Sequence, residues 1–292
     1  MAHKSGFVNI IGNPNVGKST LMNALVGTKL SIITSKAQTT RHRIQGIVNG
    51  EDYQIIYSDT PGILDPKYKL QEIMLKAAKS ALTDADIIIY VTDVNESPAI
   101  QQGFTNALLN TNIPVIVVIN KIDKSHQENV EKLIAGWKII LPSAKILPVS
   151  ATENFNIDGL FSLILGQLPD GAAFYPKDEL SDRPERFFVS EIIREKVLLN
   201  YHEEVPYATA IEVESFSEDS RLIRIRAIIF VERDSQKGII IGKKGDAIKK
   251  TGTEARLEME KFFGKRIFLE LFVKVKKDWR SNDSSLKSFG YR

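Results

Sequence analysis

Eight residues near the N-terminus have the types and spacing of a phosphate-binding loop. Residues 12–19 read Gly-Asn-Pro-Asn-Val-Gly-Lys-Ser and fill every fixed position of the pattern G-x-x-x-x-G-K-[ST]. Gly12 and Gly17 allow backbone N–H groups to turn toward phosphate oxygens at close range. Lys18 adds charge for the β- and γ-phosphates, and the Ser19 hydroxyl suits Mg²⁺. We predict a nucleotide phosphate site formed by Gly12, Asn13, Pro14, Asn15, Val16, Gly17, Lys18, Ser19 and Thr20.

A carboxylate and a threonine further along the chain could complete a magnesium site. Asp59-Thr60-Pro61-Gly62 forms D-x-x-G, 40 residues after Ser19. Such a motif brings a carboxylate to Mg²⁺ and a glycine N–H to the γ-phosphate. The polar stretch 27–43 is either a solvated loop or a segment whose threonine senses that phosphate, and we favour Thr40 over Thr39. The predicted metal ligands are Ser19, Thr40 and Asp59, the residues acting in hydrolysis are Lys18, Thr40 and Gly62, and Thr60, Pro61 and Ile63 join the nucleotide site.

A third motif indicates which base is bound. Asn120-Lys121-Ile122-Asp123 has the pattern N-K-x-D and follows an apolar run. An aspartate carboxylate can accept two hydrogen bonds from guanine N1–H and its exocyclic amine, a donor pair that adenine lacks. Ser150 and Ala151 follow a later apolar run, and a backbone N–H there could meet guanine O6. We therefore expect GTP and GDP as ligands, bound by Asn120, Lys121, Ile122, Asp123, Ser150 and Ala151.

These motifs need strands that end where the motifs begin. The sequence predicts strands at residues 7–11, 44–48, 53–57, 86–93, 113–119 and 145–149, and helices at 19–26, 70–82, 99–110 and 157–168. Asn49-Gly50 favours a hairpin turn between the second and third strands. The alternation predicts an α/β domain with a mostly parallel sheet and helices on both faces, and its motifs follow the strands' carboxyl ends. The order of the motifs resembles that of the Ras-like P-loop GTPases.

The residue after the D-x-x-G glycine departs from many Ras-like proteins. They place there a glutamine that orients the attacking water, whereas this chain has Ile63, which has no hydrogen-bonding group. We expect slow intrinsic hydrolysis and another means of positioning the water. Asn15 could help hold a K⁺ ion against the phosphates, as in the potassium-dependent GTPases of this broad class, so that K⁺ stimulates the reaction.

A stretch rich in proline, glycine and acids divides the chain. We predict a GTPase domain at residues 1–170, a linker at 171–184 and a second domain at 185–292. In the rear part, a helix at 185–200, paired strands at 207–216 and 222–231 and a final strand at 266–276 are expected. The last dozen residues are expected to form a loose, basic tail.

The most basic part of the chain contains a second glycine motif. Gly242-Lys243-Lys244-Gly245 follows an apolar turn and precedes an amphipathic helix that is expected to reach Phe263. This layout resembles an RNA-binding KH domain, α+β and of type II, whose G-x-x-G loop clamps about four nucleotides. The alternative is a glycine-bounded turn between packed helices. The predicted RNA-binding residues are Gly238, Ile239, Ile240, Ile241, Gly242, Lys243, Lys244, Gly245 and Lys249.

Charge and composition narrow the class of partners. The 292 residues carry a net charge of +3, whereas residues 237–292 alone contain 15 Lys and Arg against 7 Asp and Glu, a net +8. This asymmetry favours a polyanionic partner for the rear part. The absence of cysteine excludes disulfides and cysteine-bound zinc. With no apolar run near the roughly 18 residues that span a bilayer, and no signal peptide, we expect a cytoplasmic protein.

Taken together, the segments GNPNVGKS, QTTRHR, DTPG, NKID, VSA and GIIIGKKG resemble those of the Era family of bacterial ribosome-assembly GTPases, over nearly the whole chain. The resemblance implies GTP hydrolysis, binding to the 3′ end of small-subunit ribosomal RNA and a role in maturation of the 30S subunit. It also implies peripheral association with the inner membrane, which no feature of this sequence indicates. A monomer is expected.

Two other classes of function remain as alternatives. The phosphate loop could serve a phosphotransferase or an ATPase, against which Asp123 argues. The rear domain could instead be a KH-like adaptor that binds a membrane or protein partner and no RNA. In the favoured hypothesis, GTP orders residues 38–43 and 62–68 and thereby changes how the KH domain is held.

Overall fold

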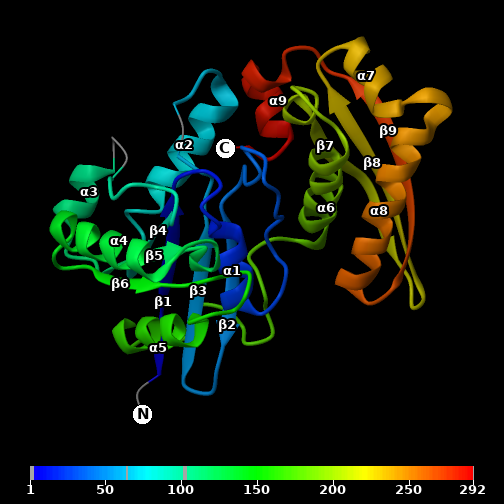
Figure 1. The fold of residues 1–292 in the computed structure, drawn as a ribbon. Coiled ribbons are helices and arrows are strands. Elements are labelled where there is room, and N and C mark those ends of the chain that lie inside the picture. Colours follow the sequence, from blue (N-terminus) through cyan, green and yellow to red (C-terminus); the bar gives the residue numbers. More distant parts are fainter. Residues whose placement is uncertain (1–2, 64, 101–103, 292) are drawn as a thin grey trace. The chain divides into compact units, whose positions relative to one another are not determined.

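The structure is a computed structural model that describes residues 3–63, 65–100 and 104–291 (Figure 1). It contains two compact units. The first comprises Met1–Ser31, Thr40–Pro66 and Met74–Asp182, and the second comprises Ile32–Thr39, Lys67–Ile73 and Arg183–Arg292.

The first unit is built on a six-stranded sheet with the order β2-β3-β1-β4-β5-β6. All neighbouring strands are parallel except β2 and β3, which form the predicted antiparallel hairpin. Every residue of β4 and β5 is buried, as expected for strands covered on both faces. The strands are β1 (Lys4–Gly12), β2 (Ile44–Asn49), β3 (Tyr53–Asp59), β4 (Ile87–Asp93), β5 (Val115–Asn120) and β6 (Lys145–Pro148).

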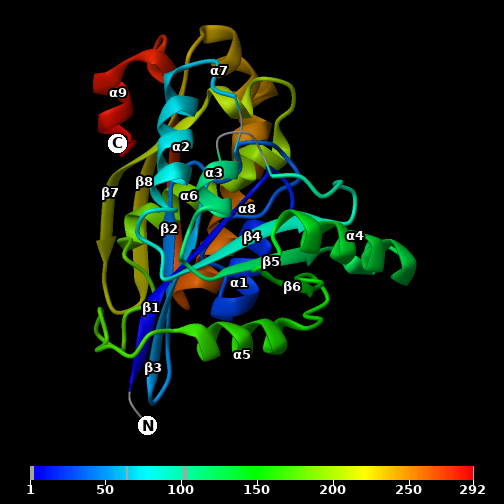
Figure 2. The same cartoon turned by 90° about the vertical axis from the view of Figure 1, so that its left-hand side faces the viewer.

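Helices cover both faces of this sheet, which confirms the predicted α/β class. Figure 2 shows α4 on one side of β4 and β5, with α1 and α5 on the other. On the α4 side, Trp137 packs against Tyr90 with ring centroids 5.3 Å apart, in a cluster that includes Ile11 and Phe104. The helices are α1 (Lys18–Val26), α2 (Lys69–Ser80), α3 (Thr105–Leu109), α4 (Gln127–Ile140) and α5 (Ile157–Gln167).

Two of these helices differ from the sequence prediction. Helix α4 was not predicted, although Val130, Leu133, Ile134 and Trp137 have the spacing of a helical apolar face. Helix α3 is shorter than the predicted 99–110, and residues 101–103 lie outside the described part of the chain.

The segment after α5 runs along β2 and β3. Ile47 N donates to Leu180 O at 2.9 Å, and Ser181 Oγ donates to Gln45 O at 2.5 Å. The buried Gln54 side chain accepts hydrogen bonds from the backbone N–H groups of residues 174 and 175 at 2.7 and 2.9 Å. Residues 171–182 are therefore hydrogen-bonded to the first unit.

The second unit has the predicted α+β character. Its sheet has the order β7-β8-β9, with β7 and β8 antiparallel and β8 and β9 parallel. Apolar side chains of α6, α7 and α8, including Val197, Ile240 and Met259, form its core with Ile225 and other residues of one sheet face. The elements are α6 (Glu185–Asn200), β7 (Ala210–Glu218), β8 (Leu222–Val231), α7 (Asp234–Ile241), α8 (Asp246–Phe263), β9 (Arg266–Val275) and α9 (Asp283–Ser288).

Two expectations for this unit were wrong. The apolar residues before Gly242 form helix α7 and not a turn, because Ile240 is fully buried in the core. The last dozen residues are not a loose tail. Leu286 of α9 is fully buried, and Tyr291 is buried and stacks on Trp279. Trp279, just before this segment, is itself fully buried and donates its indole N–H to Ala208 O at 2.8 Å. In the part of the chain that the structure describes, no helix is both long and apolar enough to cross a bilayer.

Candidate nucleotide and nucleic-acid sites

The phosphate loop joins β1 to α1 and depends on both of its glycines. Gly12 has φ +147°, and a Cβ there would lie 2.2 Å from Val91 O. Gly17 has φ +96°, and its Cβ would lie 2.3 Å from the Asn120 side-chain nitrogen. A side chain at either position would collide with a neighbouring strand or loop, so these positions require glycine for space as well as for conformation.

Lys18 is held inside the loop. Its Nζ donates to the carbonyl oxygens of Gly12 at 3.1 Å and Asn13 at 2.7 Å. Burial lowers the pKa of Lys18 to about 8, against the opposing effects of the carboxylates of Asp59 and Glu96. The ammonium group is therefore poorly solvated until an anion enters the loop, and phosphate oxygens would supply the missing negative charge.

The three predicted metal ligands lie together at the end of β3. Ser19 Oγ donates to Asp59 Oδ2 at 2.6 Å and lies 2.9 Å from Thr40 Oγ1, which donates to the same carboxylate oxygen at 3.2 Å. Asp59 is fully buried, and its Oδ1 has no hydrogen-bond partner among the described residues. Two hydroxyls and one carboxylate with an unpaired oxygen fit Mg²⁺, which binds few protein ligands and keeps the rest for phosphate and water.

The electrostatics of Asp59 agree with this assignment. Burial raises the pKa of Asp59, while hydrogen bonds from Ser19 and Thr40 and the charge of Lys18 act in the opposite direction. A divalent cation would remove the cost of the buried charge. Thr39, the alternative to Thr40, is placed differently: its hydroxyl donates to Lys36 O at 2.6 Å.

The D-x-x-G turn lies directly against the phosphate loop. Thr60 Oγ1 donates to Ile10 O at 2.8 Å, and a Cβ on Gly62 would lie 2.8 Å from the Cα atom of Pro14. Ile63 is buried in the apolar cluster beneath α2–α4. A cavity of about 490 Å³ opens beside the loop and is lined by Asn13, Pro14, Ile63, Glu96, Ser97, Ala99 and Ile100.

The N-K-x-D residues connect the base side of the site to the phosphate side. Asn120 Nδ2 donates to Val16 O at 2.9 Å, and its Oδ1 accepts from the Ala151 N–H at 3.1 Å. Asp123 accepts a hydrogen bond from Ser150 Oγ at 2.6 Å, which orients its carboxylate. The structure thus brings Asn120 and Asp123 into contact with Ala151 and Ser150, and Ile122 lies in the short 3₁₀ helix Ile122–Lys124.

Two acidic residues of this site were missed by the sequence reasoning. Lys121 Nζ contacts Asp93 Oδ2 and Asn15 O, each at 2.6 Å. Glu96 accepts from Asn13 Nδ2 at 2.8 Å and from Thr92 Oγ1 at 2.9 Å. Asp93 ends β4, whose carboxyl end borders the ligand side of an open α/β sheet, and this position is the signal that could have identified both residues.

The second glycine motif lies between α7 and α8. Gly242 and Gly245 have φ +74° and +86°, and Lys244 between them has φ +54°. A Cβ on Gly242 would lie 2.6 Å from Ala247 Cβ, so the loop closes tightly onto α8. Lys243 and Lys244 are exposed at its tip. Of the three isoleucines before the loop, Ile239 is half exposed, whereas the Ile240 side chain is fully buried and available only for packing.

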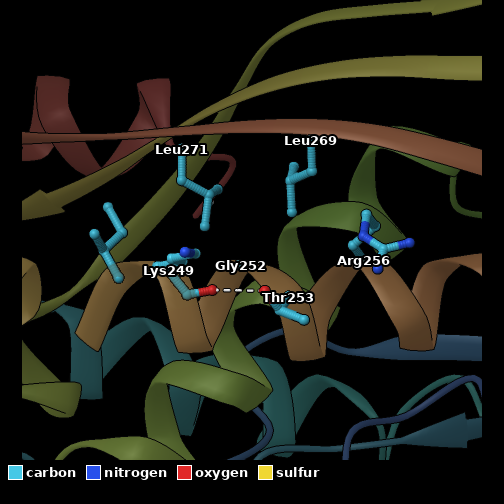
Figure 3. A pocket seen from close by; sticks show the side chains of 7 residues that line it. Lys249, Gly252, Thr253, Arg256, Leu269 and Leu271 are labelled. Atoms are coloured by element: carbon cyan, nitrogen blue, oxygen red, sulfur yellow. Dashed lines mark hydrogen bonds between the residues drawn. The ribbon is translucent and has the colours of Figure 1, made fainter. Parts of the chain in front are cut away.

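A cavity of about 260 Å³ lies between β9 and α8, the helix that begins directly after this loop (Figure 3). Leu269 and Leu271 of β9 face α8 across it, and Gly252 leaves room on the helix side, because a Cβ there would lie 3.2 Å from the Leu271 side chain. Lys249 is among the residues predicted from the sequence, whereas the other lining residues, on α8 and β9, were not predicted. The cavity is lined by Ile248, Lys249, Gly252, Thr253, Arg256, Leu269 and Leu271.

Comparison with known proteins covers both parts of the chain. Residues 7–121 match a family described as 50S ribosome-binding GTPase, and residues 204–280 match the KH domain family. GTPase Era of Geobacter metallireducens is 48% identical over 291 residues, which cover 99% of this chain and 98% of that protein. GTPase Era of Staphylococcus haemolyticus is 45% identical over 291 residues, covering 99% and 97%.

Solved structures agree over the same length. One is a crystal structure of Era in complex with MgGDPNP and nucleotides 1506–1542 of 16S ribosomal RNA, with a TM-score of 0.94, 42% identity and 99% coverage of both chains. A variant of Aquifex aeolicus Era bound to GDP·AlF₄⁻ matches with the same TM-score, identity and coverage. This chain belongs to the Era family of GTPases, in which a GTP-hydrolysing domain precedes a KH domain.

Proposed function

We propose that this GTPase is a molecular switch that binds the 3′ end of small-subunit ribosomal RNA and assists assembly of the 30S subunit. In this proposal GTP occupies the site around the phosphate loop, and RNA occupies the face formed by the G-x-x-G loop and the cavity between α8 and β9. The protein acts in the cytoplasm as a monomer, with peripheral association with the inner membrane.

At the nucleotide site, each group has a defined task. Lys18 and the backbone N–H groups of the loop bind the β- and γ-phosphates, and the Gly62 N–H meets the γ-phosphate. Ser19, Thr40 and Asp59 would hold Mg²⁺, which when bound would supply positive charge beside the phosphates. Because Ile63 cannot hold the attacking water, we expect hydrolysis to be slow in the isolated protein.

At the nucleic-acid site, glycines allow the sugar-phosphate backbone to approach while lysines supply charge. Gly242 and Gly245 leave room for the backbone, and Lys243, Lys244 and Lys249 carry the positive charge. The floor of the cavity is formed by Leu269 and Leu271, which offer an apolar surface to unstacked bases. The net +8 of residues 237–292 supports an RNA ligand over a neutral protein surface.

One observation carries the RNA proposal: a family member with 42% identity and 99% coverage has been solved with 16S ribosomal RNA. The test is binding of a labelled RNA with the sequence of the 16S 3′ end, measured with GDP and with a non-hydrolysable GTP analogue. We expect tighter binding with the analogue, and an RNA of scrambled sequence is the control. Equal affinity in both nucleotide states would contradict the switch.

Selection of guanine can be tested at Asp123. Asp123→Asn removes a carboxylate that would accept two donors from guanine, so GTP affinity should fall by roughly tenfold or more, while the weak competition by ATP stays unchanged. Competition of both nucleotides against a fluorescent GDP measures this. If Asp123→Asn weakened ATP as much as GTP, the residue would not be the base selector.

A potassium ion at Asn15 is proposed as the means of accelerating hydrolysis. Asn15 has φ +63°, a conformation that glycine also adopts, so Asn15→Gly removes the side-chain oxygen without adding backbone strain. We expect GTP hydrolysis to be faster in K⁺ than in Na⁺ at equal ionic strength, and this difference to disappear in Asn15→Gly. Equal rates of the unmodified protein in the two salts would rule out the potassium site.

A further inference from the structure

Helix α6 contains an ion pair that is buried on both sides. The side chains of Glu191 and Arg194 have relative exposures of 5% and 2%. Arg194 donates from Nε to one Glu191 carboxylate oxygen at 2.8 Å and from Nη2 to the other at 2.5 Å. Burial acts to lower the pKa of Arg194, but the charge and hydrogen bond of Glu191, together with Tyr291 and Glu195, outweigh it and raise the pKa, so the guanidinium keeps its charge in the interior.

The same guanidinium reaches the backbone of residues 32–39, which belong to the same compact unit as α6. Arg194 donates to Thr39 O, and more weakly to Gln38 O at 3.4 Å. Two further contacts hold this segment: Ile33 N donates to the Glu195 carboxylate at 3.1 Å, and Lys36 Nζ donates to Tyr201 O. The backbone leading to the next residue, Thr40, is therefore anchored to α6.

A buried ion pair contributes little net stability when apolar side chains could replace it, because desolvation cancels most of the attraction. What an apolar pair could not supply is donors for the carbonyl oxygens of residues 38 and 39. A planar guanidinium can engage a carboxylate with one edge while its remaining N–H groups reach those carbonyls. The arrangement therefore fits a role in holding backbone rather than in holding the helix.

We propose that Arg194, oriented by Glu191, is a positioning residue for the GTPase site: it fixes the backbone before Thr40 so that the Thr40 hydroxyl reaches Mg²⁺. The inference rests on the proposed role of Thr40 as a metal ligand. In P-loop GTPases the threonine segment is ordered by contacts to Mg²⁺ and the γ-phosphate and is released after hydrolysis. Loss of the anchor should therefore weaken binding of GTP and leave GDP unaffected.

The test uses the full chain with the double substitution Glu191→Gln and Arg194→Met, which removes both charges together and leaves no unpaired buried charge. Affinities for fluorescent GDP and for a non-hydrolysable GTP analogue are measured with Mg²⁺. We expect the analogue to bind roughly tenfold more weakly, the effect of losing charge-assisted hydrogen bonds, with GDP affinity within twofold. The matched control is Asp219→Asn with Arg224→Met, an exposed pair 2.8 Å apart in the same unit, which should change neither affinity.

Two outcomes of this measurement contradict the proposal. Equal losses for both nucleotides, or no loss for either, would overturn the proposal. Arg194→Lys is the second variant if the double variant does not fold: it keeps the charge beside Glu191 but has a single nitrogen to share, and it should show the same selective loss to a smaller degree.

Thr40→Ala separates this inference from the function on which it rests. If Thr40→Ala leaves GTP preference unchanged, the proposed metal role of Thr40 fails. If Thr40→Ala removes the preference and the α6 variant does not, only the positioning role fails. If Thr40 binds the metal and Arg194 positions Thr40, combining Thr40→Ala with the α6 variant should cause no further loss of GTP affinity, because both substitutions act through the Thr40 hydroxyl.

Discussion

Asn120 joins two loops of the nucleotide site through a single amide group. Its nitrogen donates to Val16 O in the phosphate loop, while its oxygen accepts from the Ala151 N–H. An amide has a donor and an acceptor at the same reach, whereas a carboxylate could only accept and would leave the Val16 carbonyl unpaired. Contacts within the protein therefore explain why the first residue of the N-K-x-D motif, Asn120, is an asparagine.

Lys18 leads to a prediction about protons. Because its pKa in the free protein is lowered to about 8 and a bound triphosphate favours the charged form, binding must take up a proton wherever Lys18 is neutral. Calorimetric titration of GTP at pH 8.5, in buffers of different ionisation enthalpy, should reveal net uptake of protons, and this uptake should be smaller at pH 7.

The charge of Lys18 also makes GTP affinity depend on pH. The fraction of Lys18 that carries charge falls as pH rises through about 8, so GTP affinity should weaken over that range and not below it. Heats that are independent of the buffer at pH 8.5 would show that Lys18 keeps its proton in the free protein.

Residues within short motifs could be located from sequence, and residues paired across the fold could not. The glycines, Lys18 and Ser19 of the phosphate loop are fixed by local backbone geometry, so spacing alone identifies them. Asp93 and Glu96 take their roles from partners on other loops, and Glu191 and Arg194 take theirs from a segment more than 150 positions away. Contacts between residues so far apart in the chain leave no local pattern in the sequence.

At the scale of elements, hydrophobic periodicity predicted most strands and helices because burial decides both. Helix α6 agrees with the expected bounds, and β8 does too. Helix α7 was missed because a run of isoleucines next to glycine has poor helix propensity, which tertiary packing of Ile240 overrides. The hydrogen bond from Tyr201 Oη to Ile240 O, 2.8 Å long, adds to that packing.

The C-terminal elements also allow a prediction. Trp279 is fully buried, packs edge-on against Phe289 at 5.4 Å and donates to Ala208 O. Trp279→Ala should lower the free energy of unfolding by about 3–5 kcal/mol, because it leaves a large cavity and an unpaired carbonyl. Denaturant unfolding of the KH-containing unit measures this. The Trp279→Phe variant should lose less, and a loss below about 1 kcal/mol in Trp279→Ala would mean that this end contributes little to the core.

At the scale of the whole molecule, charge is unevenly distributed, and this has a consequence for salt dependence. Each lysine that contacts a phosphate of single-stranded RNA contributes about 0.7 to the slope of log affinity against log salt. Replacing Lys243 and Lys244 together by alanine should therefore lower the magnitude of that slope by roughly 1.4.

The matched control removes the same charge from the other unit. Lys132 and Lys138 are exposed on α4, and their replacement by alanine should leave the slope unchanged. RNA affinity is measured from 50 to about 300 mM salt with one nucleotide throughout, a range wide enough to define the slope. If both double variants reduced the slope equally, long-range attraction and not contact at the G-x-x-G loop would explain RNA binding.

Residues 171–182 have a consequence for solubility. Strand β2 lies at one end of the six-stranded sheet, where its backbone could pair with a strand from another molecule. The hydrogen bonds that Ile47 N and Gln45 O make with residues 180 and 181 occupy that edge. The segment thus prevents edge-to-edge pairing of β2 with another molecule. A proteolytic cut within residues 171–182 would expose β2 as an unpaired edge strand, without changing any residue of the nucleotide site.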